Sequence, residues 1–247
     1  MIPLRDRNPV TRPPVLVWSL VAANITVFLF EVYLRLARGP GLLEAFMNTY
    51  GAVPARFAAT WDITPLLSSM FLHGGLLHLI GNLWFLWIFG DNVEDRLGRV
   101  RFLLLYFGTG LVAALTQIVL APQSTVPMVG ASGAIAGVLA AYVRLFPRAR
   151  VLTLIPIFIF IQFVELPAFL FIFVWFGLQL VQGTLSLGTL GANTGGTAFF
   201  AHIGGFVAGL LFVRYFTPLP GGQKRFRSAQ GRKVVYRPRG NSDHPPA

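Results

Sequence analysis

Ser132 and His202 are two polar residues, each set in an apolar stretch, whose side chains could work together chemically. The first charge after Ser132 is Arg144, twelve residues along, and the first charge after His202 is Arg214, also twelve residues along. In a helix that rises about 1.5 Å per residue, both side chains stand about 18 Å from that arginine. If the two arginines mark one face of a membrane, the serine and the histidine lie at the same depth.

A serine beside a histidine is a pairing used in nucleophilic catalysis. A serine hydroxyl is a weak nucleophile until a base removes its proton, and His202 could remove that proton and later give it to a leaving amine. No acidic residue lies at the same depth to orient the imidazole. The sequence therefore predicts that Ser132 and His202 form a catalytic dyad and not a triad.

His78 and Asn82 lie in a third apolar stretch at a similar depth, because His78 precedes Asp91 by thirteen residues. Asn82 comes four residues after His78, so it shares its helix face and lies one turn deeper. With the backbone N–H of Ser132, these side chains are the donors available to an oxyanion. Two other interpretations stay open, a structural hydrogen-bond pair or half of a metal site. The metal site is disfavoured, because no carboxylate lies in this layer and His73 is expected on another helix face, so no cofactor is predicted.

Glycines follow both members of the expected dyad at a spacing of four residues. Gly133 and Gly137 follow Ser132, and Gly205 and Gly209 follow His202. Such a stripe is more often a close-packing surface than the surroundings of a nucleophile, and that alternative stays open. The glycines would also let the two helices approach closely, which a hydrogen bond between the serine and the histidine requires.

The elements that would position these side chains are membrane helices. Of the 247 residues, 55% are hydrophobic and only 12% are charged, against about 25% charged in a soluble domain. The predicted fold class is an all-α polytopic membrane protein with six transmembrane helices. The expected spans are residues 15–34, 69–89, 102–120, 127–144, a fifth from about residue 166, and 198–216.

The segments between the expected spans differ in character. Residues 36–65 and 151–164 are expected at the membrane interface, whereas residues 91–101 are expected to form a short charged loop. Residues 183–197 are uncharged and rich in glycine, and they precede His202, so they would suit a lid over the site. The absence of cysteine excludes a disulfide framework and a thiolate metal site.

Basic residues set the expected orientation. Of the 20 lysines and arginines, 17 fall on one side of the predicted spans, which places both termini in the cytoplasm. The chain then divides into a basic N-terminal tail at residues 1–14, a six-helix domain at residues 15–216 and a basic C-terminal tail at residues 217–247. A basic tail can bind nucleic acid, but we favour an anchor beside anionic lipid and predict no nucleic-acid partner.

Four motifs in the chain match one family of membrane enzymes. They are GASG at residues 130–133, AHIGG at 201–205, HLIGN at 78–82 and GDNVEDRLG at 90–98. With these motifs the chain resembles the rhomboid intramembrane serine proteases over residues 15–216.

The resemblance implies a six-helix rhomboid-like bundle with an interfacial hairpin in residues 36–65. It also implies roles for the polar residues: Ser132 as nucleophile, His202 as general base, and His78 and Asn82 as ligands of the oxyanion. The expected partners are the lipid bilayer and single-pass transmembrane substrates, cut near the outer face at a small residue in a segment that is a poor helix.

Three further positions concern the surroundings of the expected site. His73 and Gly130 are expected to support the site. Some members of the family carry an aromatic residue one turn after the serine, stacked on the base, and this chain has Ala136 there. The short tails and the lack of cysteine suggest a bacterial inner membrane.

Two other classes of function stay open. One is a non-catalytic relative that holds membrane helices without cutting them, although such relatives lose the serine or the histidine. The other is a transporter, but no ionisable residue of the inner layer extends a path across the membrane. The oligomeric state is not predicted.

Overall fold

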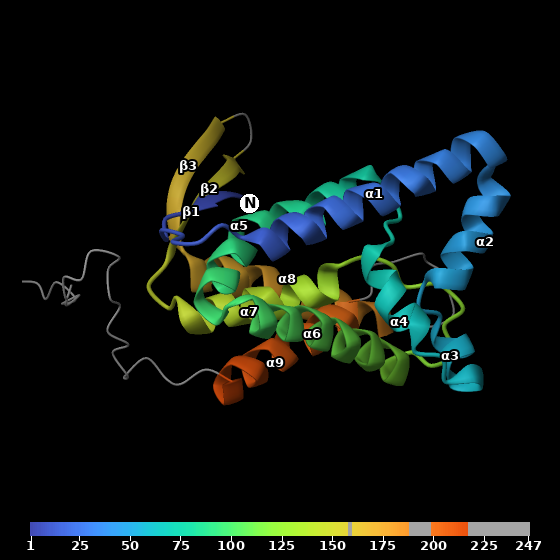
Figure 1. Cartoon of the computed structure of the whole chain (residues 1–247). Coiled ribbons are helices and arrows are strands. Elements are labelled where there is room, and N and C mark those ends of the chain that lie inside the picture. The colour runs from blue at the N-terminus through green and yellow to red at the C-terminus, as the bar shows by residue number, and fades with distance from the viewer. Residues whose placement is uncertain (158–159, 188–198, 217–247) are drawn as a thin grey trace, which may run out of the picture. The chain divides into compact units, whose positions relative to one another are not determined.

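The computed structural model describes residues 1–157, 160–187 and 199–216, which are drawn in colour in Figure 1. The helices are α1 (Val15–Arg38), α2 (Pro40–Tyr50), α3 (Pro54–Thr60), α4 (Thr64–Ser68), the 3-10 helix η1 (Ser69–Phe71), α5 (Leu76–Leu97), α6 (Arg99–Leu120), α7 (Ser132–Leu145), α8 (Ala168–Leu187) and α9 (Phe199–Phe216). The strands are β1 (Ile2–Asp6), β2 (Arg150–Ile157) and β3 (Phe160–Pro167).

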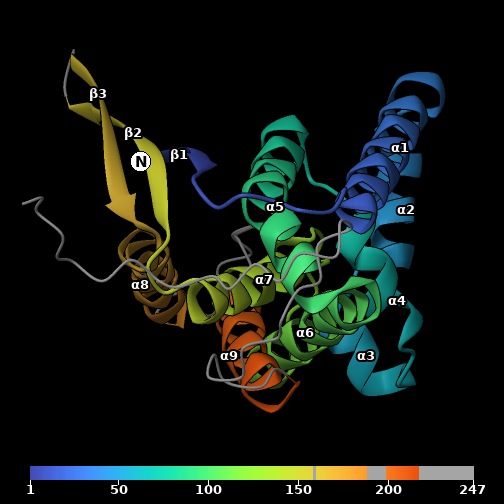
Figure 2. The same ribbon diagram turned by 60° about the vertical axis from the view of Figure 1, so that its left-hand side comes forward.

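Helix α7 lies at the centre of the helical core. Its residues from Gly133 to Tyr142 are all buried, and α5, α6 and α9 pack around it (Figure 2). Small side chains fill much of α7, so neighbouring helices can approach its backbone. Helices α5, α7 and α9 run in one direction, opposite to α1 and α6 (Figure 1). His78, Ser132 and His202 lie near the first residues of α5, α7 and α9, so they lie at the same end of the helical core.

The described residues contain fewer clear spans than the six predicted. Three helices, α1, α6 and α9, are long and apolar enough to cross a bilayer. The segment Thr64–Phe71 and α5 add a fourth if they count as one span bent by 92°. Helix α7 and the apolar part of α8, Ala168–Leu178, are shorter. A mostly helical membrane fold is supported, and the count of six stays a prediction.

Helix α5 differs from the prediction at both ends. It begins at Leu76 and not at Ser69, and it continues to Leu97 through most of the expected charged loop. One acidic residue of this segment, Glu94, binds the start of α1. Glu94 accepts the backbone N–H groups of Leu16 at 3.1 Å and Val17 at 2.9 Å, which have no partner inside their own helix.

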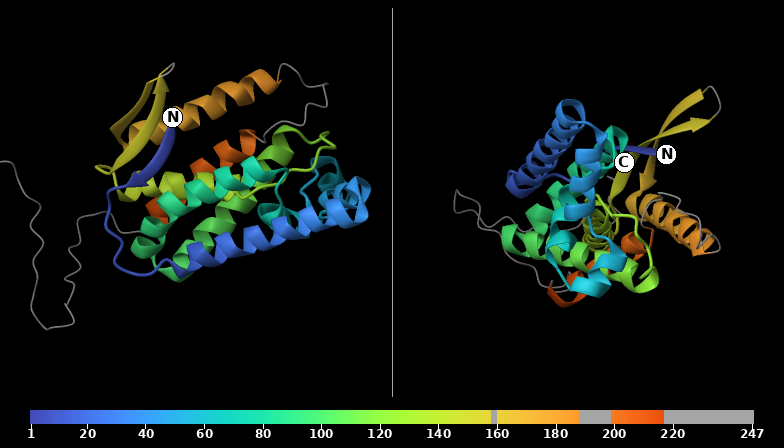
Figure 3. Two further views of the ribbon diagram at one scale, coloured as in Figure 1. Left: turned by 90° about the horizontal axis from the view of Figure 1, so that it is seen from above. Right: turned by 90° about the vertical axis from the view of Figure 1, so that its right-hand side faces the viewer.

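The prediction of an entirely helical chain is wrong at the end of the molecule where α8 begins. A three-stranded antiparallel sheet in the order β1-β2-β3 lies there (Figure 3). Residues 151–164 were expected only to lie along the membrane interface. Their carbonyl and N–H groups instead pair between β2 and β3, with Arg150 opposite Pro167 and Ile157 opposite Phe160.

The N-terminal tail supplies strand β1 of this sheet and forms hydrogen bonds with the helices. Asp6 accepts hydrogen bonds from the hydroxyl of Tyr142 at 2.6 Å and from the amide of Asn92 at 2.9 Å. Burial raises the pKa of the Asp6 carboxyl. Arg7 pairs with Glu165 of β3, three residues before α8 begins.

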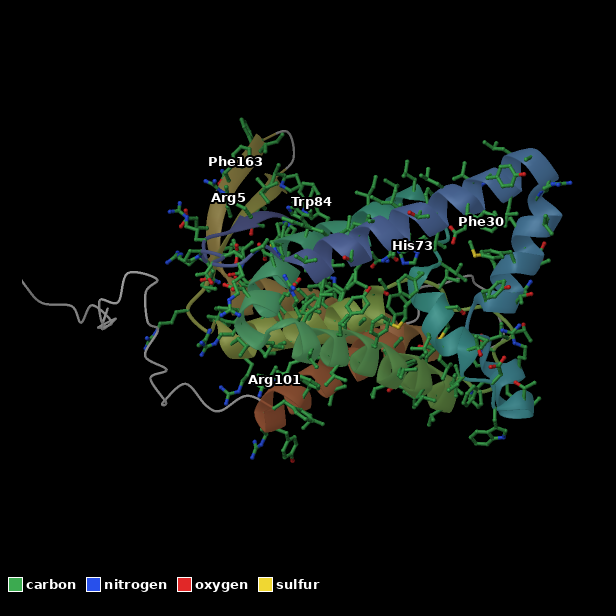
Figure 4. All side chains as sticks on the ribbon, in the orientation of Figure 1. Arg5, Phe30, His73, Trp84, Arg101 and Phe163 are labelled. Atoms are coloured by element: carbon green, nitrogen blue, oxygen red, sulfur yellow. The ribbon has the colours of Figure 1, made fainter. Side chains whose placement is uncertain are left out.

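Side chains around the sheet also contact the N-terminal tail. Arg5, Trp84 and Phe163 all lie at this end of the molecule (Figure 4). The indole N–H of Trp84 donates to the carbonyl of Pro3 at 2.5 Å, which connects α5 to β1. The C-terminal tail at residues 217–247 lies outside the described residues. Of the predicted lid, residues 183–187 belong to α8 and residues 188–197 are not described.

Candidate active site

Ser132 is the first residue of α7, directly after a sharp turn at Gly130. Gly130 has a φ of 118°, a conformation that favours glycine, and its N–H donates to the carbonyl of Ser69 at 2.8 Å. The first N–H groups of a helix have no partner within it, and the helix dipole makes this end positive. The serine hydroxyl therefore lies beside backbone donors that could bind a developing negative charge.

His202 reaches the serine from the first turn of α9. Its Nε2 lies 2.7 Å from the Oγ of Ser132, and the histidine is only 5% exposed. For Nε2 to accept the serine proton, a neutral imidazole must carry its own proton on Nδ1. The structure thus brings together the two residues that the sequence placed at one depth, in the geometry that a serine nucleophile and its base require.

The glycine stripes lie where α7 and α9 meet. A β-carbon on Gly205 would overlap the carbonyl oxygen of Gly133, and one on Gly209 would overlap the carbonyl oxygen of Gly137. The stripes are therefore a close-packing surface, and that surface sets the distance between the helices that carry Ser132 and His202. The contact between α7 and α9 is therefore both a close-packing surface and the contact that brings Ser132 next to His202.

We expect Gly205→Leu to lower both stability and activity. The larger side chain must push α9 away from α7, which costs about 1–3 kcal/mol of stability and lengthens the Ser132–His202 hydrogen bond. Thermal unfolding and peptide-bond cleavage by the purified variant measure the two effects. Gly108→Leu is the matched control, because a β-carbon on Gly108 meets nothing within 4 Å. A Gly205→Leu protein with wild-type stability and activity would contradict this role of the contact.

His78 and Asn82 converge on the turn before Ser132. A β-carbon on Gly130 would lie 2.8 Å from Nε2 of His78 and 3.3 Å from Nδ2 of Asn82. Asn82 is buried, whereas His78 is exposed. Both side chains come from the first two turns of α5. Their polar atoms thus lie against the backbone two residues ahead of the serine.

His73 lies elsewhere than the sequence predicted. It was expected on a helix, on a face away from His78, but it lies in the break between η1 and α5. The helical segments on either side of this break meet at an angle of 92°. Its Nε2 lies 3.0 Å from Nδ2 of Asn82, and its ring centre lies 5.3 Å from that of His78. His73 therefore contacts both expected oxyanion ligands.

Comparison with known proteins supports the resemblance to the rhomboid family that the sequence motifs indicate. The model of the rhomboid domain matches residues 60–218, which is more than half of the chain. The chain belongs to the rhomboid family. Its spans and this domain mark it as an integral membrane protein.

Curated rhomboid relatives come from both mitochondria and bacteria. The human presenilin-associated rhomboid-like protein, mitochondrial, is 29% identical over 203 residues, which are 81% of this chain and 48% of that protein. The rhomboid protease GluP of Bacillus subtilis is 33% identical over 137 residues, 55% of this chain and 26% of GluP. The chain spans about half the length of the mitochondrial relatives it matches.

In this rhomboid-family chain, an aromatic ring reaches the histidine from α8. Ala136, the residue one turn after the serine, is fully buried and has no ring to offer. The ring centre of Trp175 instead lies 5.7 Å from that of His202, with 42° between the ring planes. Trp175 also packs against Phe85 of α5. Sequence reasoning missed Trp175, because nothing distinguishes it among the many aromatic residues around it.

Gln117 is the other contact that the sequence left unnoticed. Its side-chain oxygen accepts the backbone N–H of Ala201 at 3.3 Å, which fixes the first turn of α9 next to His202. A polar residue inside the predicted span at residues 102–120 was the signal available.

A small cavity opens beside the serine, and small or flexible residues form much of its lining: Met70, Gly110, Ala113, Met128, Gly133 and Ala201.

Proposed function

We propose that this rhomboid-family chain is an intramembrane serine endopeptidase that hydrolyses a peptide bond in or near the transmembrane segment of membrane-protein substrates. The observation that carries the proposal is the hydrogen bond of 2.7 Å between Ser132 and His202. It joins a nucleophile at a helix N-terminus to a base on a neighbouring helix, inside a protein whose other buried side chains are mostly apolar.

The reaction begins with attack of Ser132 Oγ on the carbonyl carbon of the scissile peptide bond. His202 Nε2 takes the hydroxyl proton as the new C–O bond forms. The carbonyl oxygen becomes an oxyanion, which accepts hydrogen bonds from the Ser132 backbone and from His78 and Asn82. When the tetrahedral intermediate collapses, the C–N bond breaks and His202 gives the proton to the leaving amine. Water, deprotonated by His202, then hydrolyses the acyl-enzyme.

The family relationship supports this reaction without fixing its substrate. GluP is by name a rhomboid protease, whereas the mitochondrial relatives are named only as rhomboid-like. A member without activity would need neither a nucleophile nor a base. This chain keeps both, in hydrogen-bond contact, so we prefer catalysis to mere holding of membrane helices.

Purified protein incubated with a single-pass transmembrane substrate tests the proposal. We expect two products, cut next to a small residue near one end of the substrate helix, which mass spectrometry would identify. The serine variant Ser132→Ala serves as the control. An intact substrate with the wild-type protein, across several substrate helices and in both detergent and lipid vesicles, would favour a protein that binds membrane helices without cutting them.

Further expectations from the sequence stand beside this proposal. The partners would be the lipid bilayer and transmembrane substrates, with no nucleic acid and no cofactor. The core at residues 15–216 would form six spans, flanked by tails at residues 1–14 and 217–247. From the lack of cysteine and the distribution of basic residues, we further propose a bacterial inner membrane with both termini in the cytoplasm.

A reporter fused after Ala247 tests the orientation. The placement of 17 of the 20 basic residues on one side motivates a cytoplasmic C-terminus. A reporter enzyme that is active only outside the cytoplasm should therefore be silent, and one that needs the cytoplasm should be active. The opposite pair of results would mean that the number of spans is odd or that the whole chain is inverted, and a second reporter fused to the N-terminus would distinguish the two.

A further inference from the structure

Glu31 is a buried carboxylate for which the dyad mechanism has no use. It lies on α1 and is only 2% exposed. An ionisable side chain within a membrane helix is costly and is generally found where it does something. Its surroundings therefore indicate what it contributes.

One oxygen of Glu31 holds the loop that carries His73. Oε1 accepts the backbone N–H of His73 at 3.0 Å. His73 lies beside α1 in the break before α5 (Figure 4). The second oxygen, Oε2, is buried and has no hydrogen-bond partner in the described part of the chain. The contact with His73 is thus what the carboxylate supplies to its surroundings.

The ring of His73 in turn contacts the side-chain amide of Asn82. Nδ1 of His73 lies 3.3 Å from the carbonyl oxygen of Phe71, which can only accept, so Nδ1 carries the proton. In the neutral ring, Nε2 is then an acceptor. The group that it meets at 3.0 Å is Nδ2 of Asn82, which donates. The tautomer of His73 therefore dictates which end of the Asn82 amide faces it.

The orientation of that amide matters for the proposed chemistry. The oxygen and nitrogen of an asparagine side chain have nearly the same shape, so a free amide can turn over. In the observed orientation, Nδ2 is also the Asn82 atom nearest to a β-carbon on Gly130, at 3.3 Å, beside Ser132. An amide nitrogen carries two hydrogens, so Nδ2 can donate one to His73 and, in the proposed reaction, the other to an oxyanion. A reversed amide would present an acceptor to the negative charge instead.

We propose that Glu31 is a positioning residue for the oxyanion site. By fixing the backbone at His73, it fixes the imidazole that keeps the NH₂ group of Asn82 turned toward Gly130, two residues before Ser132. This role rests on the proposed function, because it concerns the rate of a reaction at Ser132. It does not require Glu31 to touch the substrate.

Two substitutions of similar length separate the hydrogen bond from the fold. Glu31→Gln keeps a carbonyl oxygen for the His73 N–H, so we expect kcat close to that of the wild type. Glu31→Met has no acceptor but suits an apolar core, so we expect a loss of kcat of about 10- to 100-fold with KM nearly unchanged. Asn24→Ala is the control, because Asn24 is also buried on α1 and donates to the carbonyl of Leu20.

A double variant supplies the decisive readout. If Glu31 acts through Asn82, then Glu31→Met combined with Asn82→Ala has the kcat of Asn82→Ala alone, because residues that act as a unit are not additive. Losses that multiply would overturn the proposal, as would a wild-type kcat in Glu31→Met or an equal loss in Glu31→Gln. Failure of the proposed function looks different: the wild-type protein would then cleave no more than Ser132→Ala.

Discussion

Replacing Ser132 by alanine is expected to abolish cleavage of a transmembrane substrate. The attacking oxygen is lost, and with it the group that His202 Nε2 contacts at 2.7 Å. His202→Ala should be equally inactive, because the hydroxyl then keeps its proton. The double variant should be no worse than either single one, since the two residues act as one unit. Time courses of product formation by the purified variants measure these effects.

Folding controls separate lost chemistry from lost structure. Ser132 is only partly buried and its hydroxyl contributes one hydrogen bond to His202, so Ser132→Ala should unfold at nearly the wild-type temperature. Cleavage by this variant at the wild-type rate would refute the serine mechanism. A double variant much slower than both singles would show that the two residues act independently.

Alanine at Asn82 or His78 is expected to lower kcat by about 10²- to 10³-fold, the usual cost of losing one oxyanion donor. Both side chains lie against Gly130, two residues before the serine. The interaction strengthens only as negative charge develops on the substrate oxygen, so KM should change little. Single-substrate kinetics with each variant give the two constants separately.

Asn92→Ala is the matched control for Asn82→Ala. Asn92 is a buried asparagine on the same helix, but it donates to Asp6 near the other end of α5. Its loss should affect the unfolding temperature and leave kcat unchanged. If Asn82→Ala loses activity only in proportion to its loss of folded protein, Asn82 and His78 form a structural pair and the oxyanion role is wrong.

The depth of the site in the membrane could be predicted from the sequence, because a helix rises by a fixed distance per residue along its axis. Charges mark where apolar helices end, so Ser132 and His202 could be placed in one layer before any contact was known. Their contact at 2.7 Å agrees with that placement. The glycine spacing also identified the helix surfaces that meet. These features depend on local sequence, which one chain displays fully.

Features that depend on distant pairing could not be predicted. Strand β1 pairs with β2 across about 150 residues, and the apolar run that contains β2 and β3 has no period that separates a strand from an interfacial segment. His73 was assigned to a helix because nothing in its neighbourhood announces the bend of 92°. Glu31 and Trp175 reach the site from α1 and α8, contacts that only the packing of the helices creates.

Covalent labelling tests the central claim most directly. A fluorophosphonate reacts with a serine only where a base has activated the hydroxyl, so it reports the dyad without any knowledge of the natural substrate. We expect the folded wild-type protein to carry one adduct, which peptide mapping by mass spectrometry places on Ser132. The adduct should be absent from both Ser132→Ala and His202→Ala. An unlabelled wild-type protein, or labelling of Ser132 that persists in His202→Ala, would contradict the account.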